Sequence, residues 1–236
     1  MADIVSTPFN IEDLDNITCD GCFGNHLERL YGLNENNRPE SDLPEMELKT
    51  HYSKSTPLTL FTKEPDETIF TNSQLISCYG NKQGNFYCTL FFNKIWNNLT
   101  VVPDHSGIGV IDVKLNEVIC YWKKDTLIKR IDQKIQTLML YSIERNEGQF
   151  RYDKRVLYNN TSYEKFLEMI MGGAISIDFR MRVGKNRGTA FRIKKRYLSS
   201  MYSSHDVQMD GPPSSIHSKK CPETTIGNFF SENEFE

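Results

Sequence analysis

Residues 174–183 alternate apolar and polar side chains more regularly than any other part of the chain. The apolar places hold Ile175, Ile177, Phe179 and Met181, and the polar places hold Ser176, Asp178, Arg180 and Arg182. Successive side chains of a β-strand point to opposite faces, so this segment predicts a strand with one buried and one charged face. A chain with such a strand must build a sheet that covers the apolar face.

Helical and strand patterns are mixed along the rest of the chain. Apolar residues three or four places apart predict helices at 24–33 and 125–136. Ser162 predicts the cap of a short helix that ends at Gly172-Gly173, and a further helix is predicted at 195–202. Alternating or short apolar runs predict strands at 46–50, 58–62, 85–92, 109–115, 117–122, 137–144, 149–158 and 189–193. Residues 64–84 contain many turn-forming residues and predict no long element. Because the two kinds of element intermingle, the predicted fold class is α/β (mixed α+β).

The charges are distributed unevenly along the chain. The net charge is −3, yet residues 1–50 hold eleven acidic and three basic side chains, and residues 178–196 hold eight Arg or Lys and one acid. Lysine and arginine release counterions from phosphates when they bind nucleic acid. The basic block therefore favours a polyanion partner over the alternative, a solvated basic strand.

Composition excludes several other classes. Hydrophobic residues make up 38% of the chain, enough for a packed core, and no apolar run approaches the ~18 residues of a membrane span. The first residues lack the pattern of a signal peptide, so we expect a cytoplasmic protein with its six cysteines as thiols. Cys19 and Cys22 form a CxxC without a second ligand pair, which favours a structural role. The absence of GxGxxG and Walker sequences predicts no nucleotide cofactor.

One short segment combines groups that can cleave a phosphodiester. Asp42 is followed by Glu47 and Lys49, and residues two apart on a strand share a face. Two carboxylates can hold Mg²⁺, which lowers the pKa of an attacking water, and the lysine can orient that water or stabilise the phosphate. A second segment has the same pattern, with Asp104, Asp112 and Lys114. The pattern alone leaves both candidates open.

The surroundings of the first candidate resemble the MvaI/BcnI family of restriction endonucleases, whose fold and active site are akin to those of the mismatch-repair nuclease MutH. The resemblance rests on GNHLE at 24–28, on Asp42 followed by ELKTH at 47–51, on LTLFTK at 58–63 and on RGTAFRI at 187–193. Tyr121-Trp122, the helix at 125–136 and the hairpin at 137–158 follow in matching order. The resemblance thus spans about residues 20–200, and it implies a nuclease of the PD-(D/E)xK superfamily.

The resemblance implies a sequence-specific, Mg²⁺-dependent type II restriction endonuclease that cleaves double-stranded DNA, with Mn²⁺ as a substitute metal. It makes Asp42, Glu47 and Lys49 the catalytic core and Glu28 an accessory carboxylate, and Leu48 joins Asp42 and Glu47 as a metal ligand. It implies a mixed sheet flanked by helices, with two lobes around a DNA cleft. We expect a monomeric nuclease domain over 1–202, its catalytic lobe at about 20–120 and its recognition lobe at about 121–202, and a flexible tail over 203–236.

The same resemblance places the base-reading groups in the basic block. Arginine pairs bidentately with guanine and aspartate accepts from cytosine, so a target with G·C pairs is expected. The predicted DNA-binding residues are Lys63, Asp178, Arg180, Arg182, Arg187, Arg192, Lys194 and Lys195. Lys185-Asn186-Arg187 departs from the His-Asp-His of the family, which leaves the target sequence open. A MutH-like nickase and a DNA-binding module without activity are the alternative functions.

Overall fold

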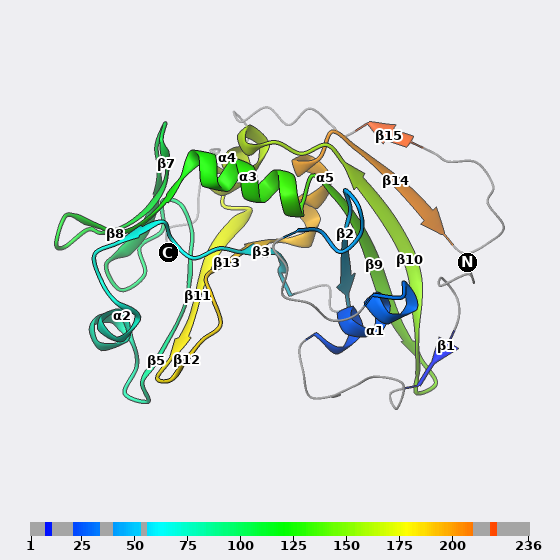
Figure 1. The fold of residues 1–236 in the computed structure, drawn as a ribbon, viewed down its shortest axis with the longest axis horizontal. Helices are drawn as coiled ribbons and strands as arrows, with labels where there is room; N and C mark the ends of the chain where they lie inside the picture. Colours follow the sequence, from blue (N-terminus) through cyan, green and yellow to red (C-terminus); the bar gives the residue numbers. More distant parts are fainter. Residues whose placement is uncertain (1–7, 11–20, 34–39, 53–55, 210–217, 221–236) are drawn as a thin grey trace, which may run out of the picture. The chain divides into compact units, whose positions relative to one another are not determined.

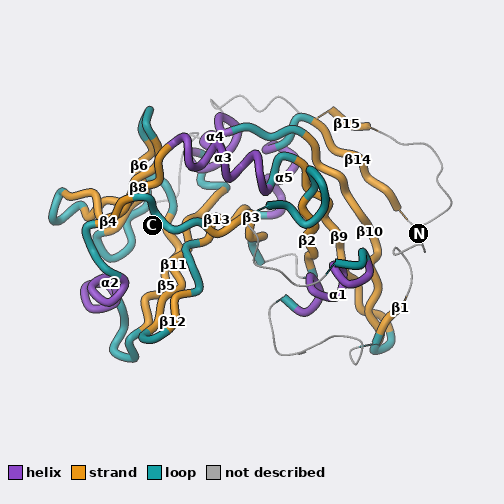
Figure 2. The backbone as a smooth tube through the Cα atoms, viewed as in Figure 1, coloured by secondary structure: helices purple, strands orange, loops and turns teal. Residues whose placement is uncertain are grey.

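The computed structural model describes residues 8–10, 21–33, 40–52, 56–209 and 218–220, and the chain divides into two compact units. Among the described residues, unit 1 comprises those within 8–56, 132–161 and 202–220, and unit 2 comprises 57–131 and 162–201. Both units combine strands with helices, so the predicted mixed α/β class is confirmed (Figures 1 and 2). In the described part of the chain, no helix has the length and apolar character that crossing a membrane requires.

Unit 1 is built on a long antiparallel hairpin, as the sequence predicts. Strands β9 (Thr137–Asn146) and β10 (Gln149–Asn159) pair along their length, and β2 (Glu47–His51) lies parallel to β9 at the end of the strand order. On the other side of β10 follow β14 (Ser204–Met209) and β15 (Ser218–Lys220), and β1 (Pro8–Phe9) also pairs with β10. The parallel pairing of β2 with β9 joins two segments that lie far apart in the sequence.

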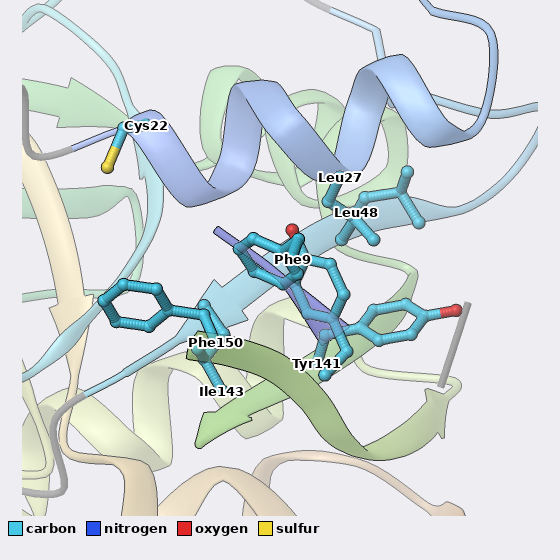
Figure 3. Packing of buried hydrophobic residues seen from close by; sticks show 8 residues of the cluster. Phe9, Cys22, Leu27, Leu48, Tyr141, Ile143 and Phe150 are labelled. Carbon is cyan, nitrogen blue, oxygen red and sulfur yellow. The ribbon is translucent and has the colours of Figure 1, made fainter. Parts of the chain in front are cut away.

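Helix α1 (Cys22–Leu30) covers part of this sheet and closes a core around Phe9, as Figure 3 shows. Leu27 of α1 and Leu48 of β2 are nearly inaccessible to solvent because each packs into that core. Cys22 is buried in the same cluster, which agrees with the structural interpretation of this thiol. Cys19, the other cysteine of the CxxC, lies outside the described residues.

Unit 2 contains two sheets. In the first, β11 (Ile175–Arg182) pairs with β5 (Asn85–Leu90), β12 (Lys185–Asn186) and β13 (Ala190–Ile193), and β13 pairs with β3 (Leu58–Thr62). In the second, the order is β4 (Glu67–Thr68), β8 (Glu117–Lys123), β7 (Gly107–Asp112) and β6 (Leu99–Pro103). The apolar face of β11 is buried as predicted, with Phe179 against Phe86.

The helices of unit 2 include one that the sequence did not predict. Helix α4 (Tyr163–Met171) has the expected cap, since Ser162 accepts from the amide of Lys165, and a 3₁₀ turn (Lys195–Tyr197) leads into α5 (Leu198–Met201). Residues 64–84, predicted as turns, hold β4 and helix α2 (Asn72–Tyr79), which begins with a capping box at Thr71. Helix α3 (Lys124–Lys134) begins in unit 2 and ends in unit 1.

Two predicted boundaries differ from the structure. The lobes were expected as continuous stretches, but residues 57–120 belong to unit 2, and residues 132–161 belong to unit 1 because β9 pairs with β2. The flexible tail was expected from residue 203, but β14 at Ser204–Met209 pairs with β10. Residues 210–217 and 221–236 of that predicted tail lie outside the described residues.

Candidate functional site

A tight turn before β2 places Asp42 beside that strand. Leu43 and Met46 exchange two backbone hydrogen bonds of 3.0 and 3.1 Å, and the intervening Glu45 has a φ of 63°. The preceding Pro44 favours such a turn because its ring fixes φ near −65°. The chain therefore doubles back, and the amide of Leu48 donates to Asp42 Oδ2 at 3.0 Å. The turn thus brings Asp42 alongside the strand that carries Glu47 and Lys49.

Glu47 and Lys49 project from the same face of β2. Lys49 Nζ donates a hydrogen bond to Glu47 Oε1, in accord with the i, i+2 spacing. The side chain of Glu47 is 1% exposed and that of Lys49 is 23% exposed. The carboxylate is thus buried, whereas the lysine side chain beside it is partly exposed.

A second lysine, which sequence reasoning missed, completes this cluster. Lys134, in the last turn of α3, places Nζ 2.7 Å from Glu47 Oε2 and 3.5 Å from Asp42 Oδ1. It also donates to the main-chain oxygen of Glu40 at 2.9 Å. The only sequence signal was a basic residue at a helix end, which is common because cations stabilise the helix dipole there.

Two carboxyl groups of this cluster have pKa values above their usual range. Burial raises the pKa of Glu47, although Lys49 and Lys134 oppose the increase. Burial also raises the pKa of Glu28 on α1, and the negative charge of Asp42 raises it further. Glu28 therefore interacts electrostatically with the same cluster, and its role as an accessory carboxylate stays a prediction. Glu28, Asp42 and Glu47 thus interact electrostatically with Lys49 and Lys134, and carboxylates are groups that can hold a cation.

The donor atoms of the cluster suit a hard metal ion. Glu47 Oε2 is a buried oxygen that Lys134 Nζ contacts at 2.7 Å. The N–H and C=O of one strand residue point to the same edge, so the carbonyl of Leu48 lies on the edge that faces Asp42. Within the described residues no group of three or more His, Cys, Asp or Glu side chains converges on one metal position. Two carboxylates and main-chain oxygens are therefore the ligands available.

The second Asp…Asp-x-Lys candidate has a structural role in unit 2. Asp112 accepts from the amides of Lys114 and Leu115 at 2.8 and 3.0 Å and from the Tyr79 hydroxyl at 2.8 Å. Asp104 accepts from two amides and the Tyr121 hydroxyl. Burial raises the pKa of both carboxyls, but these donors lower it more, so each pKa lies below its usual value. Donors within the protein thus use the acceptors that a metal would need.

Four of the predicted base-reading residues converge on one concave surface of unit 2. An open depression of about 590 Å³ is lined by Asp178, Arg180, Arg187 and Arg192, together with aromatic residues of neighbouring segments that include Tyr87 and Trp96. The amide of Arg187 donates to the carbonyl of Arg180 at 3.1 Å, which brings these two side chains from consecutive segments to one place. Three arginines with one aspartate give this surface a positive charge.

Asp178 differs from its prediction because it is buried rather than presented outward. It is 6% exposed, accepts from the Ser176 hydroxyl at 3.0 Å, and pairs with Arg192 at 3.1 Å. Arg192 also donates to the carbonyl of Pro57 at 2.9 Å. The polar face of β11 becomes more exposed from Asp178 towards Arg182. Arg192 is therefore positioned to orient Asp178.

The remaining predicted DNA-binding residues lie outside this depression. Lys63 pairs with Asp66 at 3.1 Å. Lys194 donates to the carbonyl of Gly173 at 3.2 Å and lies over the ring of Phe91, so protein groups already hold its ammonium. Arg182 is exposed at the end of β11 and lines a separate depression of about 310 Å³. Lys195 is half-buried at the start of the 3₁₀ turn.

The backbone conformation explains why the RGTAFRI segment has a glycine at position 188. Gly188 has a φ of 80°, a left-handed value that side chains with a Cβ rarely adopt. A Cβ there would also lie 3.2 Å from Glu64 Oε1, which accepts from the amide of Thr189 at 3.0 Å. This contact attaches the segment to the residues that follow β3.

The protein has a mixed α/β fold. A cluster of carboxylates and lysines lies at an edge of one sheet, and an arginine-lined depression lies on another. These are the parts that a nuclease which reads its DNA requires. The model of the MvaI/BcnI restriction endonuclease family matches residues 5–202, and the chain belongs to that family. It is therefore a site-specific DNA endonuclease.

Solved structures support the same fold. The structure described as the restriction endonuclease MvaI in complex with cognate DNA substrate matches with a TM-score of 0.70 and 24% identity, over 82% of this chain and 90% of that chain. The structure of MvaI in the absence of DNA matches with a TM-score of 0.50 and 25% identity, over 78% of this chain and 85% of that one. No curated protein matches the chain in sequence.

Proposed function

We propose that the protein is a Mg²⁺-dependent type II restriction endonuclease that hydrolyses both strands of duplex DNA at a short sequence. The observation that carries the proposal is the cluster at β2, where Asp42 and the buried Glu47 meet beside Lys49. These carboxylates suit a hard divalent cation better than a soft one, which favours Mg²⁺ with Mn²⁺ as a substitute. When bound, the metal would neutralise charge on the cleaved phosphate and lower the pKa of a water.

Each residue of the cluster has a proposed role. Asp42 and Glu47 would hold the metal through carboxylate oxygens, and Leu48 would contribute its main-chain carbonyl. Lys49, accessible beside Glu47, orients the attacking water and stabilises the negative charge of the pentacoordinate phosphate. Glu28 has a pKa raised first by burial, so it is suited to holding a proton near the site as an accessory acid or base.

Sequence reading is proposed for the depression in unit 2. Arg180 and Arg187 line it, and guanidinium groups form bidentate pairs with guanine O6 and N7. Asp178 can accept from cytosine N4, with Arg192 fixing its orientation. Arg182 and Lys195, outside the depression, are proposed to contact phosphates, which contribute affinity without sequence information. A target that contains G·C pairs follows from this set.

The proposal is tested by incubating purified protein with supercoiled plasmid in Mg²⁺ and sequencing the ends produced. Linear products with one recurring end sequence are expected. Products that stop at the nicked circle would instead favour the MutH-like alternative, in which one strand is cut. Asp42→Asn tests the assigned site, because it removes one charge and keeps the side-chain shape, and it should lose cleavage. Equal cutting by this variant would refute the assigned site.

Monomeric action is also proposed, on the resemblance to the family. Cleavage rates that rise in proportion to protein concentration would agree with a monomer, and a quadratic dependence would contradict it.

A further inference from the structure

The ammonium group of Lys134 lies among oxygen atoms that are typical ligands of a metal ion. Its Nζ is 2.7 Å from Glu47 Oε2, 2.9 Å from the carbonyl oxygen of Glu40 and 3.5 Å from Asp42 Oδ1. Two carboxylates and a carbonyl form the donor set that Mg²⁺, Mn²⁺ and Ca²⁺ prefer. The side chain itself is only 14% exposed, so this ion pair is largely shielded from water.

We propose that Lys134 is an internal counter-cation, which neutralises the metal-binding carboxylates in the metal-free protein and is displaced when a divalent ion binds. The inference rests on the proposed metal site. Glu47 is almost fully buried, and a buried carboxylate without a compensating charge is strongly destabilising. A divalent ion held by Glu47 and Asp42 would need the space that the ammonium occupies between them, so the two cations would exclude each other.

Lys134 and Lys49 differ in the way this exchange requires. Lys49 bonds Glu47 Oε1 from the same strand, so it can keep that bond while the other oxygen holds an ion. Lys134 lies 2.7 Å from Oε2, the other oxygen, and comes from a different element, α3. It can therefore leave by rotating its side chain, without disturbing β2.

The exchange has a measurable consequence for metal affinity. A ligand binds a protein less tightly in proportion to the fraction of molecules that are ready to accept it. If Lys134 occupies the carboxylates in most molecules, its removal should tighten metal binding roughly tenfold or more. The metal-free protein should at the same time become less stable, because Glu47 loses a cation. Added metal should then raise the melting temperature more in the variant than in the wild type.

The experiment is a Mn²⁺ titration of the full chain without DNA, followed by electron paramagnetic resonance, which counts free Mn²⁺ directly. Lys134→Met removes the charge and keeps the length of the side chain, and Lys134→Arg retains the charge. Lys129→Met is the matched control, because Lys129 is an exposed lysine of the same helix. Should Lys134→Met fail to fold, Lys134→Gln removes the charge and retains a hydrogen-bond donor for the Glu40 carbonyl.

Tighter Mn²⁺ binding by Lys134→Met or Lys134→Gln, with wild-type affinity in Lys129→Met and near-wild-type affinity in Lys134→Arg, is the expected result. Unchanged or weaker Mn²⁺ binding after loss of the charge would overturn the inference, because removal of a competing ammonium group should tighten Mn²⁺ binding. Asp42→Asn separates this failure from a failure of the proposed function. Equal Mn²⁺ affinity in wild type and Asp42→Asn would show that the ion binds elsewhere, and both proposals would fall.

Discussion

Replacing Asp112 with alanine should weaken the fold and leave the chemistry intact, although Asp112 belongs to one of the two segments with a nuclease-like spacing. Its carboxylate accepts three hydrogen bonds, from two amides and from the Tyr79 hydroxyl. A hydrogen bond to a charged group contributes about 1.5–3 kcal/mol, and the three are not additive. Removal also leaves the buried Tyr79 hydroxyl without this acceptor, so we expect a loss of roughly 3–5 kcal/mol in the free energy of unfolding.

Denaturant unfolding at pH 7 measures this loss, and Tyr79→Phe is its partial counterpart. That variant removes one of the three bonds and should cost about 1–2 kcal/mol. Cleavage is then compared below the melting temperatures of both proteins, where Asp112→Ala should cut at nearly the wild-type rate. If folded Asp112→Ala keeps its stability and loses cleavage, Asp112 is catalytic and the assignment to Asp42, Glu47 and Lys49 is wrong.

The same carboxyl predicts a dependence on pH. Burial raises the pKa of Asp112, but its hydrogen-bond donors lower the pKa by more than burial raises it. The folded pKa therefore lies below the unfolded one. A carboxyl of this kind stabilises the fold above its unfolded pKa of about 3.9, and this stability is lost as pH falls through the folded pKa. The difference in unfolding free energy between wild type and Asp112→Ala should therefore shrink below about pH 4. A constant difference from pH 7 to pH 3 would contradict the linkage.

Three further results are expected. Asp42→Ala and Lys49→Ala should abolish cleavage while gel-shift measurements without metal show specific DNA binding largely intact, because these groups serve the reaction rather than recognition. Arg180→Ala should cost about 1–3 kcal/mol of binding at chiefly one base-pair position, and a uniform loss over single-mismatch duplexes would make it a phosphate contact. Lys194→Ala should lower unfolding stability and change the salt slope of DNA binding by much less than one unit, since its ammonium bonds Gly173 and lies over Phe91.

Local periodicity predicted many of the elements well. The strand at 58–62 was expected with the bounds that β3 has, and the hairpin of β9 and β10 was expected over residues 137–158. The cap at Ser162 was also expected. These features depend on residues within a few places of one another, so their signal is present in any short stretch of the sequence. The spacing of Glu47 and Lys49 is of the same kind, because a strand places both side chains on one face.

Elements that depend on distant partners were not predictable in this way. Helix α2 has only eight residues, and β14 is a polar strand that exists because β10 offers it a paired edge. Asp178 was expected on an exposed face, since alternation distinguishes the two sides of a strand but does not show what covers each side. Its burial follows from Arg192, which reaches it from the neighbouring strand.

The sequence alone therefore determined the elements with a strong local pattern, the family resemblance and the candidate catalytic residues, because each rests on local spacing or on motifs in order. The tertiary structure distinguished the two nuclease-like segments. The carboxylate of Asp112 accepts structural hydrogen bonds, whereas the buried carboxylate of Glu47 is paired with lysines. It also brought Lys134 to Glu47, through a helix that lies far from β2 in the chain. Periodicity carries no information about such a contact, because it arises only when remote segments pack and a buried charge requires a partner.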